Sequence, residues 1–239
     1  MNITDHFSPN AHARSSKVDT IVLHYTDMLS AKAAMDLLCG QEAKVSAHYL
    51  IAKTGEIYRL VPEDKVAYHA GVSSWRGIKG LNETSIGIEI DNYGHIYGPE
   101  PFPDIQIKAL IDLLNAIRSR HLVDNHHIVA HSDIAPERKK DPGELFPWDK
   151  LSAAGHGIWV PSNPADMRVS THGMVIGEAL KNAQTLLSKI GYDISQNGLM
   201  DTRTKAVITA FQRHFLPLNI TGELDYATEK HIQKVAAKF

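Results

Sequence analysis

The stretch Ile128-Val129-Ala130-His131-Ser132-Asp133-Ile134-Ala135-Pro136-Glu137-Arg138-Lys139-Lys140-Asp141-Pro142-Gly143 carries the strongest signal in this chain. An apolar run of three residues ends on His131, and a proline-interrupted loop then brings in Lys139 and Asp141. A similar apolar run near the start of the chain ends on His24. Two buried strands that each end in a histidine, followed by a carboxylate, predict a metal site at the rim of a sheet.

The chemistry of these side chains supports that hypothesis. His24, His131 and Asp141 offer two nitrogen ligands and one oxygen ligand, and three protein ligands with an open fourth position form a catalytic zinc site. Zinc lowers the pKa of a bound water from about 15.7 to about 7. If the loop is extended, Lys139 shares a face with Asp141 and is placed to stabilise an oxyanion. The alternatives are a hydrogen-bonded histidine at each strand end and a solvated basic turn over residues 138–140.

Composition sets the class of protein. With 239 residues, the chain is long enough for one large domain or two unequal ones. A net charge of −2 gives no reason to expect nucleic acid, and no apolar run reaches the roughly 18 residues of a membrane span. The first residues lack the features of a secretory signal, so we expect a cytoplasmic protein, with unrecognised export to the periplasm as the alternative. The single cysteine, Cys39, excludes an intrachain disulfide.

The first two thirds of the chain alternate between strand and helix patterns. The apolar run 20–25 predicts a buried strand, Ser30 predicts a helix start, and the alternation in 85–90 places three isoleucines opposite Gly87 and Glu89. Asp104 is the predicted cap of a further helix. The remaining expected segments are a hairpin over 46–51 and 57–61, a surface loop over 69–84 and a strand over 126–131. This mixture predicts an α/β or α+β domain over residues 1–152.

The last third has a different pattern. Glycines and prolines over 153–172 predict a linker. Residues 173–239 then predict a three-helix domain, whose first helix has an apolar face from Val175 to Ile190 and stops at Gly191. The later two helices begin with the same Gly, Asp and Thr spacing, in which Asp201 and Asp225 are suited to cap the helix starts.

Five blocks of the chain together resemble the zinc-dependent N-acetylmuramoyl-L-alanine amidases of the Amidase_2 family. The resemblance covers about residues 15–152, and Trp75, the strand at 85–90 and the loop from His131 to Pro142 are closest to the AmpD/AmiD branch, which favours 1,6-anhydromuramoyl peptides. It implies a central mixed β-sheet flanked by helices, with one zinc ion per chain at the sheet rim. The matching blocks are Ile21-Val22-Leu23-His24-Tyr25-Thr26, Ser46-Ala47-His48-Tyr49-Leu50-Ile51, Tyr68-His69-Ala70-Gly71, residues 82–90 and residues 129–148.

The resemblance also implies roles for single residues. It makes His24, His131 and Asp141 the zinc ligands, Glu89 the catalytic glutamate and Lys139 the catalytic lysine. In the loop beside the expected cleft, four residues are candidates for contacts with the glycan or the peptide: His69, Trp75, Arg76 and Asn82. His48 is expected to be a packing residue or to support a ligand.

The reaction that the resemblance implies is hydrolysis of the amide between N-acetylmuramic acid and L-alanine, in peptidoglycan or in anhydromuropeptides. The C-terminal helices resemble the PG_binding_1 peptidoglycan-binding domain, with a cap that only stabilises the catalytic domain as the alternative. Two rival functions remain open: a non-catalytic peptidoglycan receptor and a phage-type lytic amidase.

Overall fold

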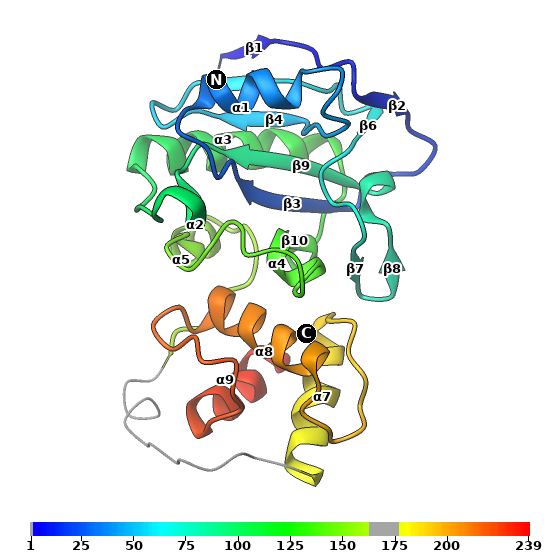
Figure 1. The fold of residues 1–239 in the computed structure, drawn as a ribbon, viewed down its shortest axis with the longest axis vertical. Helices are drawn as coiled ribbons and strands as arrows, with labels where there is room; N and C mark the ends of the chain where they lie inside the picture. The colour runs from blue at the N-terminus through cyan, green and yellow to red at the C-terminus, as the bar shows by residue number, and fades with distance from the viewer. Residues whose placement is uncertain (1, 163–176) are drawn as a thin grey trace.

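The computed structural model describes residues 2–162 and 177–239, and a six-stranded mixed sheet forms the centre of the first of these two parts (Figure 1). Only β4 and β5 pair antiparallel, while all other neighbouring strands of this sheet run parallel. The predicted mixed sheet is therefore confirmed. In spatial order its strands are β1 (Ile3–Asp5), β5 (Ile57–Arg59), β4 (Tyr49–Ile51), β9 (Ser85–Ile90), β3 (Thr20–Tyr25) and β10 (Ile128–Ala130).

The other elements surround this sheet. Two small antiparallel pairs are formed by β2 (Ala11–Ala13) with β6 (Lys65–Ala67) and by β7 (Ser74–Trp75) with β8 (Ile78–Lys79). The helices of the first part are α1 (Ala31–Leu38), α2 (Gly94–Tyr97), α3 (Asp104–Arg120), α4 (His131–Ile134) and α5 (Trp148–Ala153), with 3₁₀ turns η1 (Leu81–Glu83) and η2 (Asn125–His127). None of the helices in residues 2–162 and 177–239 is both long and apolar enough to cross a membrane.

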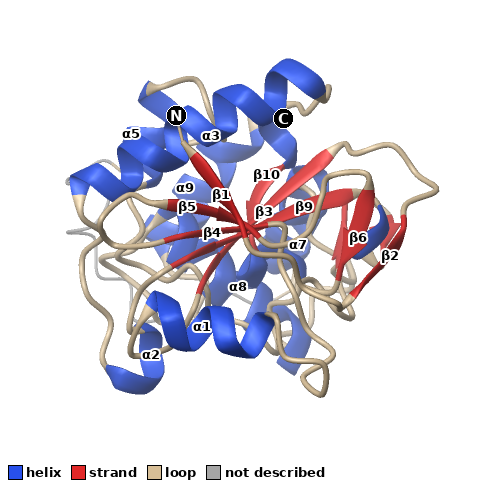
Figure 2. Cartoon of the chain, turned by 90° about the horizontal axis from the view of Figure 1, so that it is seen from above, coloured by secondary structure: helices blue, strands red, loops and turns tan. Residues whose placement is uncertain are grey.

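Helices lie on both faces of the sheet, with α3 on one face and α1 on the other (Figure 2). Ile86, Ile88 and Ile90 of β9 are fully buried in one core cluster with Leu110 and Leu114 of α3. Because side chains alternate along a strand, Gly87 and Glu89 face the opposite side. The predicted alternation of residues 85–90 is confirmed.

The pairing register places the candidate site residues beside each other. His24 of β3 is the Cα partner of Glu89 in β9, and Leu23 is the partner of Ala130 in β10. His131 follows Ala130 directly, so it emerges at the same strand ends as His24. Ligand sites of parallel sheets lie at these carboxyl ends.

Some local predictions were wrong. His131 is the first residue of the helical turn α4 rather than the last residue of a strand. Asp104 begins α3 after Pro103 instead of capping it, and its carboxylate pairs with Lys150 at 2.5 Å. The segment 69–84 is not only a surface loop, because it forms β7, β8 and η1 and buries Trp75.

Residues 177–239 form three helices, the number predicted for the C-terminal part: α7 (Glu178–Ile190), α8 (Thr202–Phe215) and α9 (Tyr226–Ala236). Asp201 and Asp225 cap the last two, each accepting a hydrogen bond of 2.7 Å from the amide of the threonine three residues on. Gly191 ends α7 with a positive φ of 142°. The predicted linker residues 163–172, together with Val175 and Ile176 of the predicted helix face, lie outside the described residues.

The C-terminal helices share one buried core with the sheet domain. The carboxylate of Asp133 in α4 is fully buried where the two parts meet. It accepts hydrogen bonds from the Tyr192 hydroxyl at 2.7 Å and from the Ala130 amide at 2.9 Å, and it lies 2.8 Å from Nδ1 of His214. The ring of Tyr192 packs edge-on against Trp75. The helical part is therefore attached through a buried polar network next to the strand end that carries His131.

We expect Tyr192→Phe to lower the free energy of unfolding by about 1–3 kcal/mol, since Asp133 loses a buried hydrogen-bond donor while the ring packing on Trp75 is kept. Urea unfolding measures this. The matched control is Tyr97→Phe, an exposed tyrosine whose substitution should change stability by less than about 0.5 kcal/mol. Equal unfolding midpoints for the Tyr192→Phe variant and the wild type would contradict the importance of this bond.

Candidate metal centre

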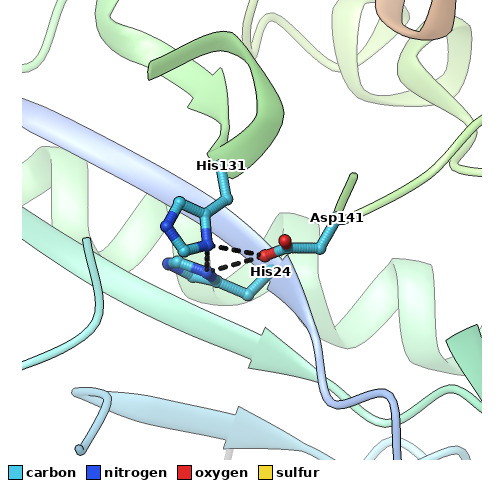
Figure 3. A group of neighbouring side chains, drawn as sticks. All are labelled: His24, His131 and Asp141. Atoms are coloured by element: carbon cyan, nitrogen blue, oxygen red, sulfur yellow. Dashed lines mark hydrogen bonds and ion pairs between the residues drawn. The ribbon is translucent and has the colours of Figure 1, made fainter. Parts of the chain in front are cut away.

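Three side chains from distant parts of the sequence converge at the carboxyl ends of β3 and β10 (Figure 3). Nδ1 of His24, Nδ1 of His131 and Oδ2 of Asp141 lie 2.9 Å from one another in all three pairs. All three residues are buried. These are the three residues that the sequence singled out as metal ligands.

The donor atoms of this cluster fit a cation. Nε2 of His131 lies 3.2 Å from the carbonyl oxygen of Ala70, which can only accept a hydrogen bond. The tautomer that satisfies this contact carries its hydrogen on Nε2 and turns the Nδ1 lone pair toward His24 and Asp141. A buried group of nitrogen and oxygen lone pairs that point at one place is the donor set of a metal ion.

The charge states suit the same conclusion. Burial, and next the neighbouring His131, lowers the pKa of His24 to about 4, so its imidazole is neutral at pH 7. Burial raises the pKa of Asp141, but the interactions with His131 and His24 outweigh burial and hold it well below the usual range. A neutral imidazole and an ionised carboxylate are the forms that bind a metal, so His24 and Asp141 are both in their ligand form at neutral pH.

Glu89 stands beside the cluster on the neighbouring strand. Its side chain faces the same cavity as His24, and its Oε2 is buried without a hydrogen-bond partner among the described residues. Burial, and next the negative charge of Asp141, raises the pKa of Glu89 well above the ordinary glutamate range. A half-buried carboxyl group that faces a cavity and has one oxygen without a hydrogen-bond partner is suited to accept and return a proton.

These groups open into one cavity of about 520 Å³. Lys139 lies in its wall together with His24, Glu89, His131 and Asp141, so the loop 138–141 brings a cation to the ligands. His69, a candidate from the sequence, also lines the cavity, whereas Tyr25, His95 and Arg138 line it without having been singled out from the sequence. Tyr25 and Arg138 adjoin predicted site residues in the sequence. No local pattern marks His95, which lies in α2, the helix that follows β9, and lines the cavity from there.

Two of the four residues predicted to contact substrate lie elsewhere. Trp75 is buried between the two parts of the chain, where its indole nitrogen donates to the carbonyl of His126 at 2.9 Å. The Arg76 guanidinium donates a hydrogen bond to the carbonyl of Ile190 at 3.2 Å, and the Arg76 backbone amide donates to the carbonyl of Gly191 at 2.8 Å. Neither lines the cavity. The β7–β8 hairpin turns both side chains toward the C-terminal helices.

The other two, His69 and Asn82, are bonded to the protein around the cluster of His24, His131 and Asp141. His69 lines the cavity, but its Nδ1 lies 3.0 Å from Nε2 of His24 and its Nε2 lies 3.1 Å from the Ser85 hydroxyl. Asn82 accepts hydrogen bonds from the amides of His69 and Ala70 at 3.1 and 2.7 Å. Both side chains are thus engaged with the protein itself.

His48 is a packing residue that braces β9, in line with its predicted supporting place. Its Nδ1 accepts a hydrogen bond of 3.0 Å from the Gly87 amide, and its ring meets that of His69 edge-on. Burial is the main cause that lowers the pKa of His48 to about 3.

The family comparison agrees with the position of the site. Residues 14–144 match the Amidase_2 family, described as N-acetylmuramoyl-L-alanine amidase, and residues 176–232 match the PG_binding_1 family of peptidoglycan-binding domains. The first match contains every residue of the metal cluster.

Individual relatives extend the match to nearly the whole chain. It is 35% identical to the N-acetylmuramoyl-L-alanine amidase AmiD of Escherichia coli over 96% of this chain and 86% of that protein. The solved complex of AmiD with the substrate anhydro-N-acetylmuramic acid-L-Ala-D-gamma-Glu-L-Lys has a TM-score of 0.78 and 34% identity, covering 95% of this chain and 93% of that one. AmpDh3 from Pseudomonas aeruginosa, solved with anhydromuramic pentapeptide, has a TM-score of 0.77 and 32% identity, with 92% of each chain covered.

We expect Gly87→Ala to destabilise the protein by about 1–3 kcal/mol, because a Cβ at this position would lie only 2.4 Å from Cγ of His69. Chemical unfolding of Gly87→Ala, His69→Ala and the double variant measures the coupling. Removal of the imidazole should relieve most of the cost of the added methyl group. Additive losses of stability in the double variant would show that the close approach of strand and ring is not the cause.

Proposed function

This chain belongs to the N-acetylmuramoyl-L-alanine amidase family, Amidase_2, and on that premise we propose that it hydrolyses the amide between N-acetylmuramic acid and L-alanine in peptidoglycan fragments. The observation that carries the proposal is the convergence of two histidines, one aspartate, one glutamate and one lysine on a single cavity. The complexes of AmiD and AmpDh3 with anhydromuramyl peptides support soluble 1,6-anhydromuropeptides as substrates here.

We propose zinc as the metal, one ion per chain, because two imidazole nitrogens and one carboxylate oxygen with an open position form a catalytic zinc site. When bound, zinc supplies a Lewis acid that activates water and polarises the substrate carbonyl. His24, His131 and Asp141 would hold it.

The other two polar groups of the cavity would handle the proton and the developing charge. Glu89 would take the proton from the attacking water and then pass it to the leaving nitrogen of L-alanine, which requires the ionised carboxylate at the start of the reaction. Lys139 would donate a hydrogen bond to the oxyanion of the tetrahedral intermediate.

For the division of the chain, we propose a catalytic domain over 1–152, a linker over 153–172 and a peptidoglycan-binding domain over 173–239. The match of residues 176–232 to PG_binding_1 supports wall binding by the last part. The buried contacts of Tyr192 and His214 with Asp133 indicate that this part also stabilises the catalytic domain. The described part of the linker is packed, since His156 and Val160 are buried.

The direct test is digestion of purified anhydromuropeptides and of intact sacculi, with metal content measured on the same sample. We expect about one zinc per chain and release of free stem peptide from the soluble fragments, detected by mass spectrometry. A chelator should abolish release, and added zinc should restore it. Binding without cleavage by zinc-loaded protein would overturn the proposal in favour of a receptor.

Faster release from sacculi than from soluble fragments would favour a phage-type lytic amidase instead. Cell fractionation completes this comparison. Recovery in the periplasm would place the enzyme beside the intact wall, and recovery in the cytoplasm would place it with soluble fragments.

We expect Glu89→Gln to lower kcat by about 10²–10⁴-fold and Lys139→Ala to lower it by about 10²–10³-fold, with zinc content unchanged. Glu56→Gln, at an exposed turn, is the control. Since burial raises the pKa of Glu89 and the base must be ionised, wild-type activity should be lost as pH falls through that raised pKa. A rate that stays flat into the ordinary glutamate range, or an active Glu89→Gln variant, would contradict the role of Glu89.

A further inference from the structure

We propose that His69 is a positioning residue: it fixes the ring of His24 so that the Nδ1 lone pair points at the metal. The inference rests on the proposed function in one respect, namely that His24 is a metal ligand. It gives His69 a structural place in the site instead of a contact with substrate.

The direction of each hydrogen bond follows from a series of hydrogen bonds that starts at a backbone carbonyl. The carbonyl oxygen of Leu81 can only accept, so the Ser85 hydroxyl, 2.5 Å away, donates its single hydrogen to it. Ser85 Oγ must then accept from Nε2 of His69 at 3.1 Å. A neutral imidazole that donates through Nε2 has its lone pair on Nδ1.

That lone pair decides the state of His24. Nδ1 of His69 accepts from Nε2 of His24 at 3.0 Å, so His24 carries its hydrogen on Nε2. Its own Nδ1 is left as a lone pair, 2.9 Å from both Nδ1 of His131 and Oδ2 of Asp141. The chain of bonds therefore selects the one neutral tautomer of His24 that can bind a metal from this position.

The same segment also holds the second histidine ligand. Ala70, the residue after His69, offers the carbonyl that accepts from Nε2 of His131 at 3.2 Å. Asn82 accepts hydrogen bonds from both amides of this dipeptide, and Arg138 donates to the Ala70 carbonyl at 3.1 Å. The dipeptide 69–70, fixed by Asn82, thus orients both imidazoles of the site, one through the His69 ring and the other through the Ala70 carbonyl.

The space for this arrangement is provided by β9. The ring of His69 lies against Gly87, where even a methyl group would overlap it. It also meets the rings of His48 and His24 edge-on, with centroids 5.7 and 5.1 Å away. Packing therefore restricts the ring to the orientation in which both of its nitrogens are bonded.

The test compares two substitutions of His69 by their zinc affinity, measured as competition between metal-stripped protein and a chromophoric chelator. His69→Leu fills the space but accepts no hydrogen bond, and we expect it to weaken zinc binding by about 10–100-fold. His69→Asn offers an acceptor at the position of Nδ1 and should recover most of that loss. The matched control is His127→Leu, which removes a bond to Thr20 at the other end of β3 and should leave zinc affinity unchanged.

A second readout needs no metal. In nitrogen-15 spectra of the metal-free wild type, His24 should carry its hydrogen on Nε2, and His69→Leu should lose this single tautomer. Wild-type protein with this tautomer but without affinity for zinc would refute the proposed zinc site and leave the role of His69 supported. Unchanged zinc affinity and an unchanged His24 spectrum in folded His69→Leu would overturn the inference. If that variant does not fold, the same two measurements are made on Ser85→Ala, which removes the acceptor of His69 Nε2. Unchanged zinc affinity and an unchanged His24 spectrum in this variant would likewise overturn the inference.

Discussion

The parallel pairing of β3 with β9 on one side and β10 on the other is the constraint on which the site depends. This register puts His24 next to Glu89 and delivers His131 at the neighbouring strand end. A shift of one residue along β9 would turn Glu89 toward α3 and an isoleucine toward the cavity, because side chains alternate in a strand. The buried isoleucines of β9 therefore fix the position of the carboxyl group as well as the core.

The loop after β10 adds Asp141 and Lys139, and it is held from two sides. Asp133 ties the Ala130 amide to Tyr192 and His214 of the C-terminal helices. Close to the ligands, the Ser132 amide donates to the carbonyl of Asp141 at 3.0 Å. The Asp133 carboxylate is buried and hydrogen-bonded, so it can hold these segments rigidly together. The same carboxylate without hydrogen-bond donors would destabilise the protein. The helical part thus contributes to the shape of the catalytic part as well as carrying a family signature of its own.

The groups around the cluster of His24, His131 and Asp141 fall into two sets with different chemical properties. On the cavity side stand Glu89 and Lys139, which are suited to proton transfer and to stabilisation of negative charge. The segment 69–70 lies beside the cluster, where the His69 ring, which also lines the cavity, and the Ala70 carbonyl contact Nε2 of the two histidines. Such outer partners set which ring nitrogen of a histidine keeps its lone pair, so they determine which atoms of this cluster could bind a metal. His69 and Asn82, which the sequence suggested as substrate contacts, are hydrogen-bonded within the protein.

The sequence by itself determined the class of fold, the strands at 20–25 and 85–90, the helix caps at Asp201 and Asp225, and the candidate ligands. These follow from short-range patterns of apolar spacing, capping residues and resemblance along the chain. Only the tertiary structure decided that Trp75 and Arg76 face the C-terminal helices, that His69 contacts His24, and that Asn82 accepts from the amides of residues 69 and 70. Their surroundings are made by residues far away in the sequence, Tyr192 and Ile190 for the first pair and His24 for His69. No local pattern records which distant surface will cover a side chain, because that depends on how the sheet and the helices pack.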